Sequence, residues 1–129
     1  VLDSERMQKF EGRDQIELFE IEMTFHREDG GWSVLTAHRG QANEKTRAVY
    51  VWDTVVLKTD KGWTLETEEL YHDNARERIH NDVFNRVYRG DDWGTGYGLE
   101  ATPDLEYIEF KRETESEVGD ESRTGEGEF

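Results

Sequence analysis

A turn followed by tryptophan occurs three times in this chain at nearly constant spacing. The motifs are Asp-Gly-Gly-Trp at 29–32, Asp-Lys-Gly-Trp at 60–63 and Asp-Asp-Trp-Gly at 91–94. Each motif precedes a strand-like segment, a polar turn and a second such segment, which is the pattern of a repeated strand pair. The repeat restricts the chain to a series of hairpins. We expect its tryptophans to mark strand starts rather than to bind a ligand (Trp32, Trp63 and Trp93).

Between these turns, apolar residues recur at every second position, which is the period of a half-buried strand. Ile21, Met23 and Phe25 are one example. Because Leu18 and Phe19 are adjacent, the alternation slips there, and we predict a β-bulge in the first strand. The fold class is therefore all-β, an open twisted antiparallel sheet built from consecutive hairpins. The predicted strands lie near 15–25, 32–38, 47–58, 63–71, 78–88, 93–101 and 105–113.

The stretch 66–80 admits a second interpretation. Tyr71, Ala75 and Ile79 are spaced four apart, as on one face of an amphipathic helix. The equivalent stretches of the other two copies contain glycine or proline, which are poor helix formers. Consistency between the copies therefore favours a hairpin through Asp73 and Asn74, and a helix remains the alternative.

Composition limits both the core and the partners. The chain has 129 residues, of which 33% are hydrophobic and 36% are charged, so we expect one domain with a modest core. A formal net charge of −15 disfavours nucleic acid as a partner, because phosphate binding requires clustered Lys and Arg. We predict an N-terminal extension at 1–14, the domain at 15–113 and an acidic, disordered tail at 114–129.

No residue pattern predicts catalysis, a metal or a cofactor. Cysteine is absent, and the four histidines fall in different predicted hairpins without a spacing that would direct two of them at one metal. The acidic turns lack the ligand spacing of a calcium loop. Paired carboxylates are expected everywhere in so acidic a chain and identify no site. We therefore predict a protein that is not an enzyme.

Glycine occupies every second position at Gly94, Gly96 and Gly98. On a strand, this leaves one face without side chains, so a neighbouring sheet or an apolar ligand could approach the backbone closely. A strongly twisted strand at a bend of the sheet explains the pattern equally well.

Several segments together resemble the LptC family of periplasmic lipopolysaccharide export proteins. They are Trp32-Ser-Val-Leu-Thr-Ala-His, Val49-Tyr-Val-Trp-Asp-Thr-Val-Val-Leu, Trp63-Thr-Leu-Glu-Thr-Glu-Glu-Leu-Tyr and Gly96-Tyr-Gly-Leu-Glu. The resemblance covers roughly 15–113 and extends to the related LptA bridge protein, so it leaves an LptA-like role open. It implies a β-jelly-roll-like "boat" that accepts lipopolysaccharide from an inner-membrane ABC transporter and passes it to an LptA-like bridge protein.

The same resemblance implies a location in the periplasm, with anchoring to the inner membrane by an N-terminal helix that this sequence does not include. The lipid A acyl chains would lie in an apolar groove. We expect this groove to be lined by Ile21, Met23, Phe25, Val34, Val49, Val51, Val55, Leu57, Leu65, Ile79, Val83, Leu99, Ile108 and Phe110. The expected partner-binding edge contains Leu105, Tyr107, Ile108 and Phe110. The alternative is a protein-interaction module that uses only its sheet edges and binds no lipid.

Overall fold

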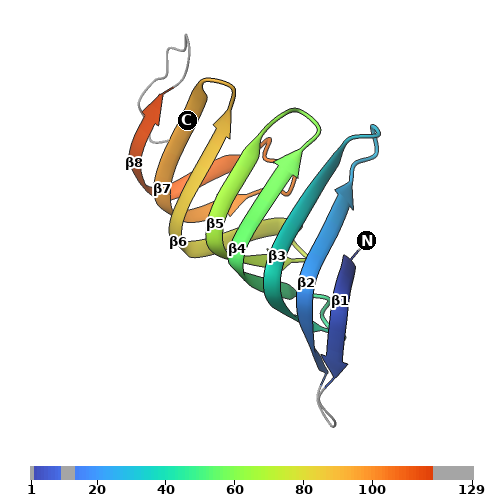
Figure 1. Ribbon diagram of the computed structural model, residues 1–129. Coiled ribbons are helices and arrows are strands. Elements are labelled where there is room, and N and C mark those ends of the chain that lie inside the picture. Colours follow the sequence, from blue (N-terminus) through green and yellow to red (C-terminus); the bar gives the residue numbers. More distant parts are fainter. Residues whose placement is uncertain (1, 10–13, 118–129) are drawn as a thin grey trace.

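The computed structural model describes residues 2–9 and 14–117, and in these residues all regular structure is β-strand (Figure 1). Eight strands form one antiparallel sheet in which every strand pairs with the next along the chain, so the predicted open sheet of consecutive hairpins is confirmed. The strands are β1 (Leu2–Lys9), β2 (Gln15–His26), β3 (Trp32–Asn43), β4 (Val49–Thr59), β5 (Thr64–Asp73), β6 (Arg78–Arg89), β7 (Asp92–Ala101) and β8 (Ile108–Glu117).

Both ends of the sheet differ from the prediction. Residues 2–9, expected as an extension, form β1 and pair with β2, so the strand predicted near 15–25 is not an edge. Few residues of β1 are apolar, so it lacks the alternation that revealed the other strands. At the other end, β8 starts at Ile108 rather than at 105 and continues to Glu117. The rest of the predicted acidic tail, 118–129, lies outside the described residues.

The region 66–80 is a hairpin, as the comparison of the repeats predicted. β5 and β6 pair along their length, and Tyr71 lies opposite His80. The turn is stabilised by Asp73, whose Oδ1 accepts hydrogen bonds from the backbone N–H groups of Ala75 (3.1 Å) and Arg76 (3.2 Å). The helical spacing of the apolar residues is therefore coincidental.

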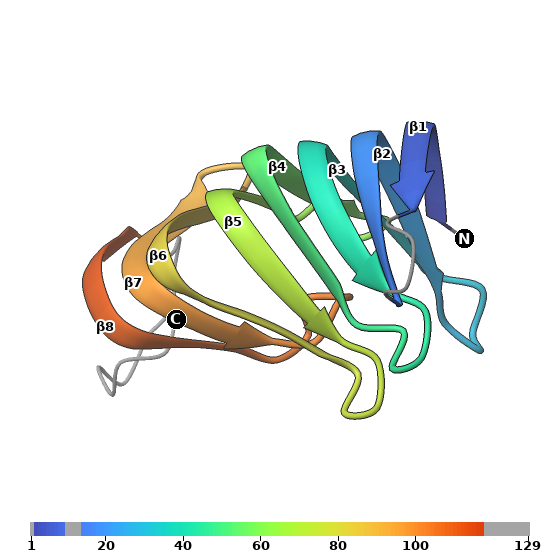
Figure 2. The same cartoon turned by 90° about the horizontal axis from the view of Figure 1, so that it is seen from below.

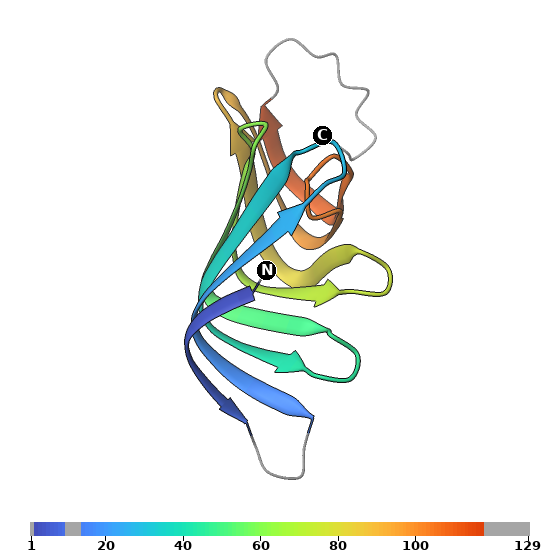
Figure 3. The same cartoon turned by 90° about the vertical axis from the view of Figure 1, so that its right-hand side faces the viewer.

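Each strand in the middle of the sheet is bent near its centre. The pairing register shifts within five neighbouring strand pairs, for example between Trp52 and Val55 in β4. In β4 the bend falls on Asp53 and Thr54, with φ of 76° and 58°. Such bulges bend strands and increase their twist. Figures 2 and 3 show the result, a sheet that curves around its own concave face.

The bend of β2 arises differently from the prediction. We expected a β-bulge at Leu18 and Phe19, but β2 keeps one constant register with both of its neighbours. Glu20 instead adopts the left-handed region, with φ of 55°. This conformation changes which face of the sheet the following side chains point to, without the extra residue of a bulge. Leu18 (0% exposed) and Ile21 (3% exposed) can therefore both lie in the core.

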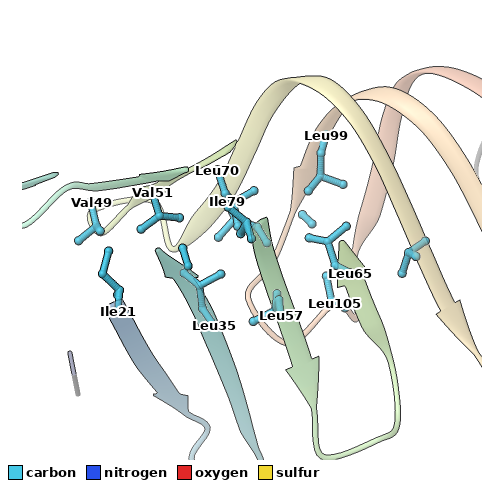
Figure 4. Close-up of a cluster of buried hydrophobic side chains, with 14 of the residues drawn as sticks. Ile21, Leu35, Val49, Val51, Leu57, Leu65, Leu70, Ile79, Leu99 and Leu105 are labelled. Atoms are coloured by element: carbon cyan, nitrogen blue, oxygen red, sulfur yellow. The ribbon is translucent and has the colours of Figure 1, made fainter. Parts of the chain in front are cut away.

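The core lies between the two walls of the bent sheet (Figure 4). One row of side chains crosses four strands in register: Leu35 is opposite Leu57, Leu57 is opposite Leu65, and Leu65 is opposite Val87. All four are at most 1% exposed. The full buried cluster comprises Leu18, Ile21, Leu35, Ala37, Val49, Val51, Val55, Leu57, Leu65, Leu70, Ile79, Val87, Leu99, Ala101, Leu105 and Phe110.

A buried polar cluster accompanies the bends of β5 and β6. Asn81 and Asn85 are 0% exposed and hydrogen-bond to each other through their side-chain amides. Asn81 Nδ2 also donates to the carbonyl oxygen of Glu69 (2.9 Å), and the Thr67 hydroxyl donates to that of Phe84 (2.8 Å). Bulges interrupt the ladder of backbone hydrogen bonds, so these side chains bind carbonyl groups that would otherwise be buried without partners.

The tryptophans of the repeat lie where strands begin. Trp32 is the first residue of β3, Trp63 directly precedes β5, and Trp93 is the second residue of β7. The backbone N–H of Asp60 donates to the carbonyl of Trp32 (3.0 Å), which joins the first two of these turns. The predicted role of the repeat as a marker of strand starts is confirmed.

Candidate functional site

The structure brings together twelve of the fourteen residues predicted to line a groove. Nine belong to the buried cluster: Ile21, Val49, Val51, Val55, Leu57, Leu65, Ile79, Leu99 and Phe110. Three more are partly buried and pack against it: Met23, Phe25 and Ile108. The concave face of the sheet thus carries an apolar cluster that extends from β2 to β8 and includes a buried polar pair, Asn81 and Asn85, on β6.

The other two residues lie outside this cluster. Val34 is opposite Thr24 and Lys58, whereas its neighbour Leu35 faces the core. The alternation of Trp32 and Val34 therefore identified the wrong face, which is the error that a slip of one residue produces. Val83 lies within the register shift of β6, where the inward positions belong to Asn81 and Asn85.

Sequence reasoning missed five large members of the cluster, which are Leu18, Leu35, Leu70, Val87 and Leu105. The hairpin register could have identified Leu35, because it is opposite Leu57, a residue that the alternation did identify. Val87 could have been identified in the same way, because it is opposite Leu65. Leu18 and Leu70 lie beside bends that change which residues of the strand point inward, and Leu105 lies in a loop.

The interior is closed in this conformation. Its central side chains are at most 1% exposed, for example Val51, Leu57 and Leu65, so they pack against one another and leave no open groove between the walls. The interior is accessible at its margin. A cavity of about 450 Å³ lies where β2 faces the β5–β6 turn and the β7–β8 loop, and its lining includes Met23, Phe25, His72, Arg76, Arg78 and Pro103.

His72 stands at this margin with its imidazole against the ring of Phe25, at 4.9 Å between ring centroids. The residue is 8% exposed, and among the described residues its Nδ1 has no hydrogen-bond partner. Burial lowers the pKa of His72, so its side chain is neutral near pH 7. The mouth of the interior therefore combines a neutral imidazole and apolar side chains with charged residues such as Arg76 and Arg78.

His38 has the opposite environment. It lies on an exposed part of the sheet, and its Nδ1 is 3.0 Å from Oε1 of Glu20. This hydrogen bond and the charge of Glu20 raise the pKa of His38. Its favourable contribution to stability is therefore present below the ordinary pKa of 6.5 and is lost as the pH rises through the higher pKa of the folded state.

We expect the two histidines to titrate on opposite sides of the ordinary pKa of 6.5. For His72 the sign is reversed: its contribution is present above that value and is lost as the pH falls through the lower pKa of the folded state. Titration of the imidazole signals by NMR measures both pKa values. A His72 that titrates above His38 would contradict the described environments.

Side chains of β8 occupy the space beside two of the three predicted glycines. A Cβ added to Gly96 would lie 2.6 Å from Cγ of Phe110, and one added to Gly98, at φ 78°, would lie 2.7 Å from Cδ of Lys111. Gly94 is buried and pairs with Val87 and Ser116. The close approach predicted for this strand therefore comes from its neighbour in the sheet.

Replacing Gly96 with alanine should lower the free energy of unfolding by about 2 kcal/mol, because the new methyl group and the Phe110 ring would occupy the same space. Chemical denaturation measures this change. In a Phe110→Ala background, the additional cost of Gly96→Ala should fall below about 1 kcal/mol. An equal cost in both backgrounds would show that the Phe110 contact is not the cause.

Only part of the predicted partner-binding edge lies on an edge strand. β1 and β8 each have a strand neighbour on one side in the described sheet, so each offers a free row of backbone groups. Ile108 and Phe110 belong to β8, and Phe110 points into the core. Tyr107 is 43% exposed in the preceding loop. Leu105 is buried and does not lie on the edge.

Other classes of site find no support in the described part of the chain. There, no group of three or more His, Asp or Glu side chains is placed to hold a metal ion. The same residues include no helix that is long and apolar enough to cross a membrane. The arrangement offers two surfaces for binding, an apolar interior and the edges of the sheet.

The comparisons with known proteins agree with this arrangement. The family model described as "Lipopolysaccharide-assembly, LptC-related" matches residues 1–117, whereas a search of curated proteins finds no match. The family match covers β1 to β8, so it includes the whole described sheet. The chain therefore belongs to the LptC family, whose members take part in lipopolysaccharide transport in the cell envelope.

Proposed function

We propose that this protein carries lipopolysaccharide by holding its acyl chains between the two walls of the bent sheet. The observation that carries the proposal is the continuous apolar cluster on the concave face, which is open to solvent at the margin beside Met23 and Phe25. Burial of each methylene group contributes about 0.8 kcal/mol, so several acyl chains could be held without any catalytic group. The protein would then act as a carrier and not as an enzyme.

In this proposal the two edges of the sheet join the protein to its transport partners. Lipopolysaccharide would enter from an inner-membrane ABC transporter and leave toward an LptA-like bridge protein, on the periplasmic side of the membrane. Strand addition at β1 and β8 would align the concave faces of successive proteins into one path. The support for these partners and this location is membership of the LptC family.

A second candidate function is that of an interaction module without a lipid. The closed interior favours it, because residues such as Leu57 and Leu65 are 0% exposed and form a complete core with no ligand. In that case only the edges of the sheet would bind a partner, and the apolar concave face would be an ordinary hydrophobic core. The two functions differ in whether the interior ever contacts lipid.

A photoreactive amino acid distinguishes these functions in a Gram-negative host. Benzoylphenylalanine in place of Phe25, at the mouth of the interior, should crosslink to lipopolysaccharide. The matched control replaces Phe84, which is 42% exposed and lies outside the buried cluster. Equal labelling at both positions, or none at Phe25, would contradict the carrier function. Protein adducts from a probe at Arg112 on β8, without lipid adducts at Phe25, would support the interaction module.

A further inference from the structure

Leu105 is the one residue of the buried cluster that does not lie on a strand. It belongs to the loop between β7 and β8, which spans 102–107. Its side chain is 4% exposed, and Figure 4 shows it with Leu57 and Leu65, which belong to the same cluster. A loop thus fills part of the space between the walls.

The backbone of Leu105 is strained. Its φ of 61° lies in the left-handed region, which a bulky non-glycine residue rarely adopts. The loop holds this conformation by internal hydrogen bonds: the N–H of Leu105 donates to the carbonyl of Thr102 (2.8 Å), and the N–H of Thr102 donates to that of Tyr107 (3.0 Å). A rearrangement of the loop that takes Leu105 out of the left-handed region would release the strain.

Arg27, in the turn between β2 and β3, fastens the loop to the rest of the molecule. Its guanidinium lies 3.6 Å from Asp104 and 3.2 Å from Glu106, both in the loop. It also lies 3.0 Å from Asp29 and 3.8 Å from Asp60, and its side chain is 18% exposed. One cation therefore lies within 3.8 Å of four carboxylates from three separate connections and offsets part of their mutual repulsion. Without it, these carboxylates would repel one another and weaken the attachment of the loop.

We propose that the loop 102–107 is a displaceable plug of the lipid-binding interior, with Leu105 in the place that an acyl chain takes. This inference rests on the proposed function. The strands of the core are fixed by backbone pairing on both sides of their bends, whereas the loop is attached by a few hydrogen bonds and the Arg27 ion pairs. An entering acyl chain replaces the apolar contacts of Leu105, and the release of backbone strain favours the exchange.

Stopped-flow fluorescence with dansyl-labelled dodecanoic acid tests the attachment of the plug. Arg27→Gln should increase the association rate about fivefold, because the loop opens more often. The matched control is Arg86→Gln, on β6 outside the buried cluster, which should leave the rate unchanged. Equal rates for Arg27→Gln and the wild type would show that the Arg27 ion pairs do not hold the loop in place.

Leu105→Gly tests the plug itself, since it removes the side chain and relieves the positive φ. It should also bind the probe faster than the wild type, whereas Val87→Ala, which removes buried volume from a strand, should not. Hydrogen exchange gives a second measurement: saturating probe should increase exchange of the amides at 102–107. Probe binding with a loop that stays protected would overturn the plug and leave the carrier function intact. No binding by any of these proteins would overturn both.

Discussion

Leu57→Ala should lower the free energy of unfolding by about 3 kcal/mol. Leu57 is 0% exposed at the centre of the row formed with Leu35 and Leu65, so truncation removes contacts on both sides and leaves a cavity between the walls. Urea denaturation followed by tryptophan fluorescence measures the change. Lys58→Ala, one residue further along β4 and exposed, should change stability by less than about 0.5 kcal/mol.

A loss below about 1 kcal/mol for Leu57→Ala would mean that the interior is loosely packed without a ligand. The tight packing described for the walls would then be wrong. If the protein carries lipid as proposed, the large loss expected here means that an entering acyl chain replaces existing apolar contacts and does not enter an empty groove.

Asn81→Leu should be about as destabilising, with a loss of about 3 kcal/mol. The substitution leaves the buried amide of Asn85 and the carbonyl of Glu69 without the hydrogen bonds that Asn81 supplies. Calorimetry or chemical denaturation measures the loss. Asn74→Leu, at an exposed position in the β5–β6 turn, provides the matched control and should have a small effect.

The double variant Asn81→Leu/Asn85→Leu distinguishes the cost of breaking the hydrogen-bonded amide pair from the cost of changing the side-chain volume. Once Asn81 is replaced, the amide of Asn85 has already lost its hydrogen bonds to Asn81, so replacing Asn85 as well should cost less than it does alone. Strict additivity of the two single losses would show that the amide pair does not act as a unit. The bend of β5 and β6 would then be held by the backbone alone.

The sequence predicted the strand pairs because their turns and their alternation are local signals. The repeat resolved the segment 66–80, where spacing alone suggested a helix, because a helix in one copy would conflict with the other two. β1 was missed because it carries neither signal: its composition is polar, and it has no turn motif of its own.

The candidate site was harder to predict than the fold because side-chain direction depends on bends that are not visible in a sequence. Val83 lies within a register shift, which changes which residues of β6 point inward. Val34 was assigned to the interior because it alternates with Trp32, but the buried residues of this part of β3 are Ser33 and Leu35. Leu105 shows a different limit. It was predicted to lie on a strand edge, whereas its loop returns to the core, a long-range contact that no local pattern indicates.

Native mass spectrometry of the protein purified from a Gram-negative host tests lipid carriage most directly. The proposed function predicts a bound species with the mass of lipopolysaccharide or lipid A, and its occupancy should rise when purified lipid A is added. Protein that stays free of lipid under both conditions, while it remains folded, would contradict the carrier function.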